Sequence, residues 1–254
     1  SPNPLMILAV RRPMRLLRSV MPAIALPCLV LLGACGGGGD GNSLAPGPST
    51  YDIAAGVSGL ATHGMKANLT VSGTVTVSGV AVPLTGTGTL SLAAAVADTF
   101  NGAAAQTQAE TVSATVVAGG QSAPYSRTVS DHYDPTTYAL LGESSPGEYD
   151  VAQTPITFPA TVTAGSSGTL GTLSRYTDNT LGVSLGTVQI SYLVKAPVDA
   201  NAPAVVEFTN RFFDTNGAMS ATAVRDYSLT TANVMLLVSS TVQEGTDTLT
   251  VTVK

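Results

Sequence analysis

The amino-acid sequence predicts an all-β fold, an antiparallel meander of roughly ten to twelve strands that forms a sandwich or a strongly curved sheet. Three observations predict it. Apolar and hydroxylic residues alternate from Leu69 to the C-terminus, the period-two pattern of strands with one buried face. Valine and threonine, whose branching at Cβ suits extended backbone, fill these runs. Residue pairs that contain glycine, asparagine or proline separate one run from the next.

The N-terminal segment, residues 1–34, is a leader that takes no part in the fold. Arg15 and Arg18 precede an apolar run that begins near Ser19, and small residues close this run before Cys35. A basic start, a short apolar core and small residues before a cleavage point are typical of a secretory signal peptide.

A transmembrane helix is the alternative interpretation of the same run. Such a helix needs about 20 apolar residues, whereas this run is shorter and contains Pro22 and Pro27. Met14 is the natural start of the leader, in which case residues 1–13 are an upstream extension that is not translated.

The end of the leader, Leu32-Gly33-Ala34-Cys35 followed by the tract Gly36–Asp40, resembles the lipobox of Gram-negative bacterial lipoproteins. The resemblance implies that Cys35 receives a diacylglyceryl group, that the signal is cut before it, and that the new amine is acylated. Three acyl chains would hold the protein to a membrane durably. In this family an aspartate after the cysteine favours the inner membrane, so Gly36 at that position implies the outer membrane.

Residues 35–50 join the lipidated cysteine to the folded part as a flexible tether of glycine, proline and serine. With about 15 residues its root-mean-square reach is roughly 20 Å. Residues 51–254 are then expected to form a single β domain.

The alternation of buried and exposed positions is clearest in four stretches of this domain. They are Val71–Val77, Val188–Val194, Val206–Phe212 and Leu249–Val253. Turn signals separate the runs at Gly119-Gly120, Asp134-Pro135, Asn216-Gly217 and Glu244-Gly245. Asn216-Gly217 is the strongest of these and predicts a two-residue type I′ hairpin, because Asn and Gly best tolerate positive φ at both central positions.

Helix is expected to be almost absent from the domain. The alanine-rich segments Ala93–Ala97 and Ala103–Ala105 could form a short helical turn, but Phe100-Asn101-Gly102 between them indicates a reverse turn.

A weak internal echo indicates two related halves of about 80 residues. Gly88–Ser91 recurs as Gly171–Ser174, and three further dipeptides recur in the same order at separations of 76 to 80 residues. Chance matching in a chain rich in threonine, glycine and alanine is the alternative.

Charge and cysteine content exclude several classes of function. The mature chain, residues 35–254, has 7 basic and 16 acidic residues, a formal net charge of −9. Such a protein repels phosphate backbones, so nucleic acid is not an expected partner. Cys28 leaves with the signal and Cys35 is lipidated, so no cysteine remains for a disulfide or a thiolate metal site.

Histidine is the scarcest of the residues that carry acid–base chemistry. His63 is expected in a surface loop, and His132 near the surface at a strand end. In a strand His132 and Asp134 would share one face, with Asp131 and Tyr133 on the other. Two ligands do not make a metal site. A buried His132 with a serine hydroxyl about 3 Å away would instead favour a hydrolase.

The other polar motifs indicate no chemistry. No Gly-x-Ser-x-Gly stretch follows a buried strand, and Gly86-Thr87-Gly88 lacks the lysine and helix of a phosphate loop. Carboxylates cluster around Pro146-Gly147, namely Glu143, Glu148 and Asp150, without the spacing of a calcium loop, so a solvated acidic loop is expected. Tyr133 and Tyr138 could contribute to a sugar site but more often close the ends of a core.

The sequence therefore predicts a non-catalytic lipid-anchored envelope protein, a tethered β module that contacts a protein or a polymer. The alternatives are a carrier or chaperone for an apolar ligand in a curved sheet and, third, a hydrolase. Cys35 is the only site residue expected; no catalytic residue, cofactor or metal ligand is predicted. The location expected is the outer membrane, on a face that the sequence does not fix.

Overall fold

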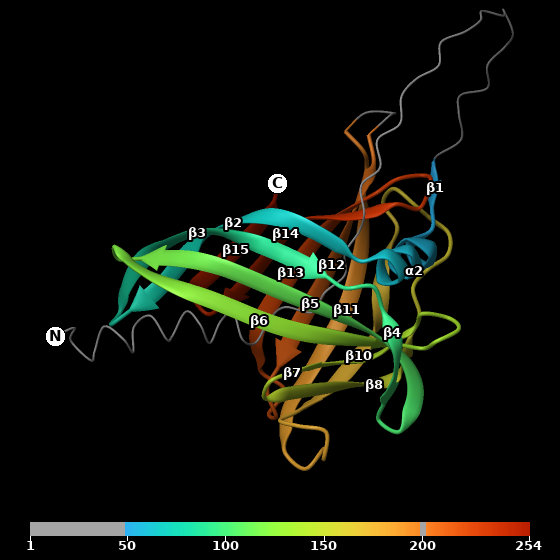
Figure 1. Ribbon diagram of the computed structural model, residues 1–254, viewed down its shortest axis with the longest axis horizontal. Helices are drawn as coiled ribbons and strands as arrows, with labels where there is room; N and C mark the ends of the chain where they lie inside the picture. Colours follow the sequence, from blue (N-terminus) through green and yellow to red (C-terminus); the bar gives the residue numbers. More distant parts are fainter. Residues whose placement is uncertain (1–48, 199–201) are drawn as a thin grey trace, which may run out of the picture.

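The computed structural model describes residues 49–198 and 202–254. The expected signal peptide, Cys35 and almost all of the tether lie outside the described residues. Within them the chain forms a closed antiparallel β-barrel with one short helix, so the predicted all-β meander is confirmed. Figure 1 shows the strands curving around a common interior, with the helix at one end.

The helix is α2 (Ile53–His63). The barrel strands are β2 (Met65–Val77), β3 (Val80–Leu92), β5 (Ala103–Ala118), β6 (Gln121–Tyr133), β7 (Leu140–Ser145), β8 (Glu148–Ile156), β10 (Ser167–Tyr176), β11 (Ser184–Lys195), β12 (Ala204–Phe213), β13 (Met219–Leu229), β14 (Met235–Glu244) and β15 (Asp247–Val253). Three shorter strands are β1 (Thr50–Tyr51), β4 (Val96–Phe100) and β9 (Val162–Thr163).

Two pairings close the barrel: that of β2 with β15, which joins the two ends of the domain, as in Leu69 opposite Val253, and that of β3 with β5. Its strands are hydrogen-bonded in the order β3-β2-β15-β14-β13-β12-β11-β10-β8-β7-β6-β5, and β3 pairs with β5 to complete the circle. In that pairing Leu90 lies opposite Val112 and Leu84 opposite Ala118. The sheet is thus a cylinder rather than a sandwich, and closure removes the edges that open sheets expose. β4 continues along β5 beyond the end of β3.

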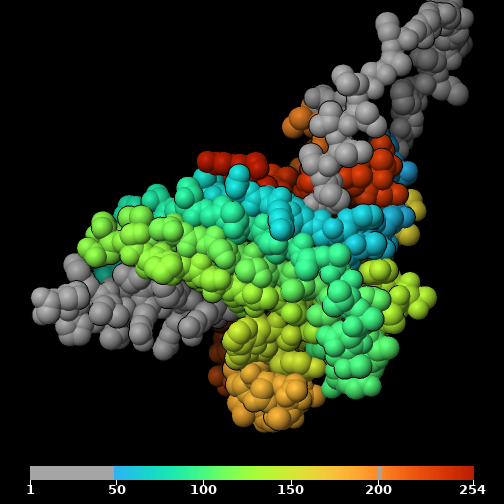
Figure 2. Space-filling model, viewed as in Figure 1, coloured from blue at the N-terminus to red at the C-terminus, as the bar shows by residue number. Residues whose placement is uncertain are grey.

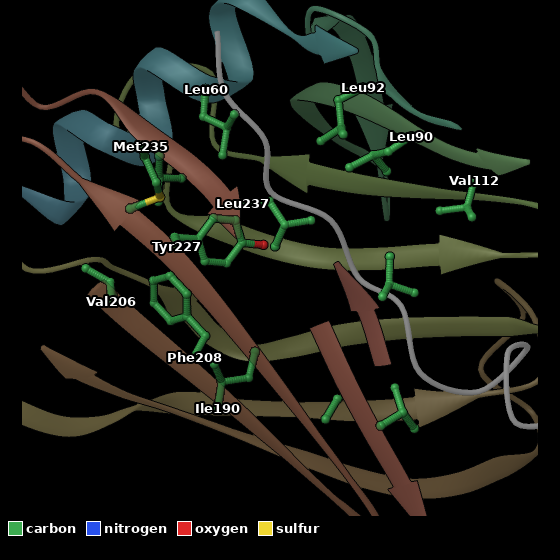
Figure 3. Packing of buried hydrophobic residues seen from close by; sticks show 14 of the residues in the cluster. Leu60, Leu90, Leu92, Val112, Ile190, Val206, Phe208, Tyr227, Met235 and Leu237 are labelled. Atoms are coloured by element: carbon green, nitrogen blue, oxygen red, sulfur yellow. The ribbon is translucent and has the colours of Figure 1, made fainter. Parts of the chain in front are cut away.

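The two faces of the barrel wall differ sharply in chemistry. In β2, Leu69 and Val71 are buried inside, at 2% and 4% exposure, while Thr70 and Ser72 between them face outward. The same alternation runs through the other long strands, so the interior is an apolar core at the helix end. Figure 3 shows part of it, with Leu60, Met235 and Leu237 close together.

Helix α2 closes one end of the barrel, and the sequence analysis did not anticipate it. Asp52 caps its first turn by accepting a hydrogen bond from the Ala55 N–H at 2.8 Å. Ile53, Val57 and Leu60, spaced four and three residues apart, form its buried face. The helix falls before Leu69, where the period-two pattern starts.

The predicted hairpin at Asn216-Gly217 exists, but its turn type is wrong. Only Gly217 has positive φ, and the loop runs from Asp214 to Ala218, which exchange a backbone hydrogen bond of 2.9 Å. The Asp214 carboxylate accepts from the N–H groups of Asn216 and Ala218. The loop is therefore a type I turn followed by a left-handed glycine.

Two-residue turns with positive φ at both central residues occur at other sites. They are Ser78-Gly79, Asn101-Gly102 and Gly119-Gly120. The reverse turn expected at Phe100-Asn101-Gly102 joins β4 to β5. Val96-Ala97 and Ala103–Ala105 belong to these strands and Ala93–Ala95 precede β4 without helix, so the suggested helical turn is wrong.

The two segments of the internal echo do not occupy equivalent positions in the barrel. Gly88–Ser91 lies in β3 and Gly171–Ser174 in β10. These strands are separated by an odd number of antiparallel steps around the barrel, so they run in opposite directions.

Candidate functional site

His132 is buried on the outer face of the barrel wall. It belongs to β6, is 6% exposed, and its ring stacks on Phe100 at a centroid distance of 4.2 Å. The expected position near the surface is therefore wrong. The reason is the β4–β5 hairpin, which folds over the outer face of β6, β7 and β8. Figure 2 shows this hairpin, in green, lying against the yellow-green surface of β7 and β8.

Glycine at position 142, which has no side chain, makes room for the β4–β5 hairpin. A Cβ on Gly142 of β7 would lie 2.5 Å from the Phe100 ring. Phe100 also stacks on Tyr149 of β8 at 4.9 Å, and the N–H of Asn101 donates to the Tyr149 hydroxyl at 3.2 Å. These contacts seal the His132 ring between the barrel wall and the hairpin.

Both nitrogens of His132 have hydroxyl partners. Nδ1 lies 2.8 Å from Oγ1 of Thr107 on β5, and Nε2 lies 2.9 Å from Oγ of Ser144 on β7. Asp134, the expected partner, instead accepts hydrogen bonds from the N–H groups of Thr136 and Thr137 in the turn after β6. The sequence could not reveal these partners, because they come from two other strands.

Burial lowers the pKa of His132 to about 4, and the nearby carboxylate of Asp98 offsets this only in part. The ring is therefore neutral at pH 7. Asp98 itself is exposed on β4, where hydrogen bonds from the Thr99 backbone and then the Thr107 side chain lower its pKa. Thr107, His132 and Ser144 thus form a chain of hydrogen bonds across three strands.

The short distance between a buried histidine and a serine hydroxyl, which would favour a hydrolase, is present between His132 and Ser144. The other features that this chemistry requires are less well provided. The group on Nδ1 is a hydroxyl rather than the carboxylate of a typical triad. A base with a pKa of about 4 is far from the optimum for catalysis at neutral pH. Ser144 lies inside a strand that pairs on both sides, so sheet hydrogen bonds compete for the neighbouring backbone N–H groups that an oxyanion would need.

His63 has a different environment from the one expected. It is the last residue of α2 rather than part of a loop, and it is exposed as predicted. Its Nδ1–H donates to the Gly59 carbonyl at 2.6 Å, an ordinary contact at a helix C-terminus.

The inward face of the barrel carries a second polar cluster. Charged side chains from adjacent strands share this face with the apolar core: Glu110, Arg127, Asp131, Glu143, Glu148, Asp150, Arg175 and Arg225. The expected solvated loop around Pro146-Gly147 is wrong, because this pair forms a tight turn and the carboxylates beside it belong to β7 and β8.

Ion pairs join part of this cluster into a network. Glu148 accepts hydrogen bonds from both Arg127, at 3.2 Å, and Arg175. The Nε of Arg175 lies 3.6 Å from Asp150, and its guanidinium lies 4.9 Å from the centre of the Phe212 ring. These groups, on strands that meet at the end of the barrel away from α2, stiffen that part of the wall.

For the other carboxyl groups of this cluster, nearby positive charges offset the effect of burial less completely. Burial raises the pKa of Glu143 well above its usual value, and the facing charges of Asp131 and Asp150 raise it further. Burial also raises the pKa of Asp150 to about 7 despite its contact with Arg175. Tyr133 donates to Asp131 at 3.2 Å inside the barrel and is only 1% exposed, so it does not present a sugar-stacking surface.

A small cavity separates the polar cluster from the apolar core. Its volume is about 30 Å³. Apolar side chains such as Ile156 and Phe208 line one side, and Glu143, Arg225 and Asn210 line the other. That volume suits about two water molecules and leaves no room for an acyl chain or a similar ligand.

Across the two described ranges, no group of three His, Cys, Asp or Glu residues is placed to hold a metal ion. In the same ranges, no helix has the length and apolar content to cross a membrane.

The outward face of the wall is hydroxylic and charged. β5 and β6 present Thr111, Ser113 and Thr128, while β12 and β13 present Glu207 and Asp226, which share Lys195 in ion pairs of 2.8 Å. Strands that face lipid carry an apolar outer band and a polar interior. Here most outward side chains of the long strands are polar, the exposed apolar ones are scattered, and the interior combines an apolar core with the polar cluster, so the outer face is suited to water.

Scans of known protein families and of curated proteins found no match. Among solved structures, the chain is similar to a porin-like protein from Bacteroides uniformis, with a TM-score of 0.23 and 10% sequence identity. The alignment covers 74% of this chain and 97% of that chain. A likeness this weak identifies neither a family nor a function.

Proposed function

We propose that this chain is a lipid-anchored envelope protein whose barrel stands in water and acts by contact with a protein or polymer, without catalysis. The observation that carries the proposal is the arrangement of the two faces of the wall. Hydroxyl and charged groups predominate on the outside, among scattered exposed apolar side chains, and packed Val, Leu and Phe fill the inside next to the buried polar cluster. A barrel of this kind does not need lipid around its wall, so attachment to a membrane falls to the predicted lipid on Cys35.

The interior favours a binding module over a carrier. A carrier needs an empty apolar volume, whereas the cavity here is about 30 Å³ and is lined partly by Glu143 and Arg225. The surface is then the part of the molecule available to a partner, and its overall negative charge disfavours polyanions.

Fractionation of cells that express the full chain tests the anchoring part of the proposal. The wild-type protein is expected in the membrane fraction at mature size, and Cys35→Ser as an unprocessed precursor. The matched control is Cys28→Ser, which removes the other cysteine and should leave processing intact. Mature-size, membrane-bound protein from Cys35→Ser would contradict the proposal.

A hydrolase is the second candidate, because Ser144 lies 2.9 Å from Nε2 of a buried histidine. Turnover of chromogenic acetyl and butyryl esters by the purified domain tests it. Hydrolysis that disappears in Ser144→Ala and survives in Ser130→Ala, the serine directly opposite on β6, would put the hydrolase first. Equal background rates in all three proteins would remove it.

A further inference from the structure

The tip of the β4–β5 hairpin, residues Val96–Ala105, is joined to the barrel wall by side chains and not by strand pairing. β4 pairs with β5 alone. Ala103–Ala105 of β5 pair only with β4, because β5 meets β6 from Gln106 onward and β3 from Glu110 onward. We call this segment the flap. It can leave the wall without breaking any strand pairing outside its own hairpin.

Two buried side chains hold the flap against the wall, as the green hairpin in Figure 2 shows. Phe100 is 4% exposed and stacks on His132 and Tyr149, with centroid distances of 4.2 and 4.9 Å. Ala105 lies on the same face of the hairpin and is 2% exposed. Every other residue of the flap is exposed. The attachment therefore depends on these two side chains and on the bond from the Asn101 N–H to Tyr149.

The partners of His132 suit a neutral ring. Its two nitrogens contact the hydroxyl groups of Thr107 and Ser144, which carry no charge to balance an imidazolium. Phe100 covers one face of the ring, and the side chain is 6% exposed. A proton added to this ring would therefore be a charge held away from water.

Among the described groups on the strands packed around the ring, one carboxylate favours its protonation. This is Asp98 of β4, which lies on the flap and offsets burial only in part. Asp131, Glu143 and Asp150 belong to β6, β7 and β8 but lie on the inward face of the wall. Asp134 is occupied by backbone N–H groups of its own turn.

We propose that the flap is an acid-released strap, which lies closed over the uncharged His132 ring at neutral pH and swings away from β6, β7 and β8 when that ring is protonated. Lifting Phe100 admits water to the imidazolium and leaves the ladders of the barrel intact. This device depends neither on the lipid anchor nor on the absence of catalysis.

The direction and size of the response follow from linkage. The closed flap holds the pKa of His132 at about 4, chiefly through burial, whereas a ring in water has a value of about 6.5. The open form therefore binds the proton more tightly, and acid favours opening as the pH falls below about 6.5. The ratio of open to closed flap should rise roughly 20-fold from pH 7 to pH 5, and roughly 200-fold by pH 3.

The accessibility of an introduced thiol measures this opening. The chain from residue 36 onward contains every described residue and no cysteine. Ala105→Cys places a thiol at a buried position of the flap, and Ala104→Cys places one at the exposed position beside it. The ratio of their labelling rates with 4,4′-dithiodipyridine cancels the pH dependence of the reagent and of an ordinary thiol. We expect this ratio, buried over exposed, to rise roughly 20-fold from pH 7 to pH 5.

The same two cysteines in a His132→Phe background provide the control. Phenylalanine keeps a ring beneath Phe100 but takes up no proton, so the ratio should stay constant with pH; His132→Gln replaces it if that variant does not fold. His63→Gln, which removes the exposed histidine of α2, should respond like the parent. A constant ratio in the parent, or an equal rise without His132, would overturn the proposal. Loss of the barrel's circular dichroism at pH 5 would do so too, because opening would then be global unfolding.

Discussion

At the scale of single residues, the buried carboxyl groups of the barrel interior set its response to pH. Glu143 and Asp150 both have raised pKa values, chiefly because burial disfavours their charged forms. A carboxyl whose folded-state pKa is raised adds stability below its unfolded value of about 4, and that stability is lost as the pH rises through the folded value. His132 acts in the opposite sense, since its lowered pKa destabilises the fold only below about pH 6.5.

Above about pH 6.5 His132 is neutral in both the folded and the unfolded protein, so a change in stability with pH there reports on the carboxyl groups. We expect the melting temperature to fall as the pH rises above about 6.5, because Glu143 stays protonated in the folded protein after it has ionised in the unfolded chain. Glu143→Gln keeps the shape but cannot ionise, so it should reduce this fall and raise stability at the upper end. Thermal unfolding of both proteins across the range measures the effect, and parallel curves would contradict it.

A turn residue provides a second prediction at this scale. Asn101 has a φ of 50° in the β4–β5 turn, whereas Asn216 does not adopt positive φ in its longer loop. Replacement by alanine should cost about 1 kcal/mol at Asn101, where a side chain without asparagine's local hydrogen bonds is strained. The same change at Asn216 should cost less than about 0.5 kcal/mol. Denaturant unfolding compares the two directly.

At the scale of elements, local patterns predicted the strands well and the helix poorly. Alternation identified the regions around Val71, Val188 and Val206 because each strand has one buried face. The helix was missed because it is only 11 residues long and rich in glycine and alanine. Its signals were present: an aspartate cap at Asp52 and apolar residues at Ile53, Val57 and Leu60.

Two glycines of α2 give a matched test of its packing. A Cβ on Gly59 would meet nothing within 4 Å, whereas one on Gly56 would lie 3.1 Å from both Leu229 and Met235. Gly59→Ala should stabilise the domain by roughly 0.5–1 kcal/mol through helix propensity alone. Gly56→Ala gains the same propensity but must displace two tightly packed side chains, so it should be less stable than Gly59→Ala. Equal stabilisation by both would show that α2 packs loosely.

At the scale of the whole molecule, closure of the barrel and the His132 cluster share one reason for being invisible in the sequence. Barrel closure depends on the pairing of β2 with β15 at opposite ends of the domain, and the His132 cluster depends on side chains that β4, β5 and β7 bring to the same face of the wall, across a register shift next to His132. The shift separates His132 from Asp134, which a regular strand would have kept on one face. Alternation shows that one face of a strand is buried, but it does not show which strands pair to enclose that face.

The orientation of the wall is the property that most directly separates this barrel from one that spans a membrane. Ser113 and Val112 are neighbours on β5 with opposite orientations, one exposed and the other 2% exposed. Ser113→Lys should change the free energy of unfolding by less than about 0.5 kcal/mol. Val112→Lys places an unpaired charge in the apolar interior and should cost more than about 3 kcal/mol. Both are measured by urea unfolding of residues 51–254 in detergent-free buffer. In a barrel surrounded by lipid the outward lysine would be the costly one, so a large loss at Ser113 with tolerance at Val112, or a domain that folds only in detergent, would refute the water-facing orientation.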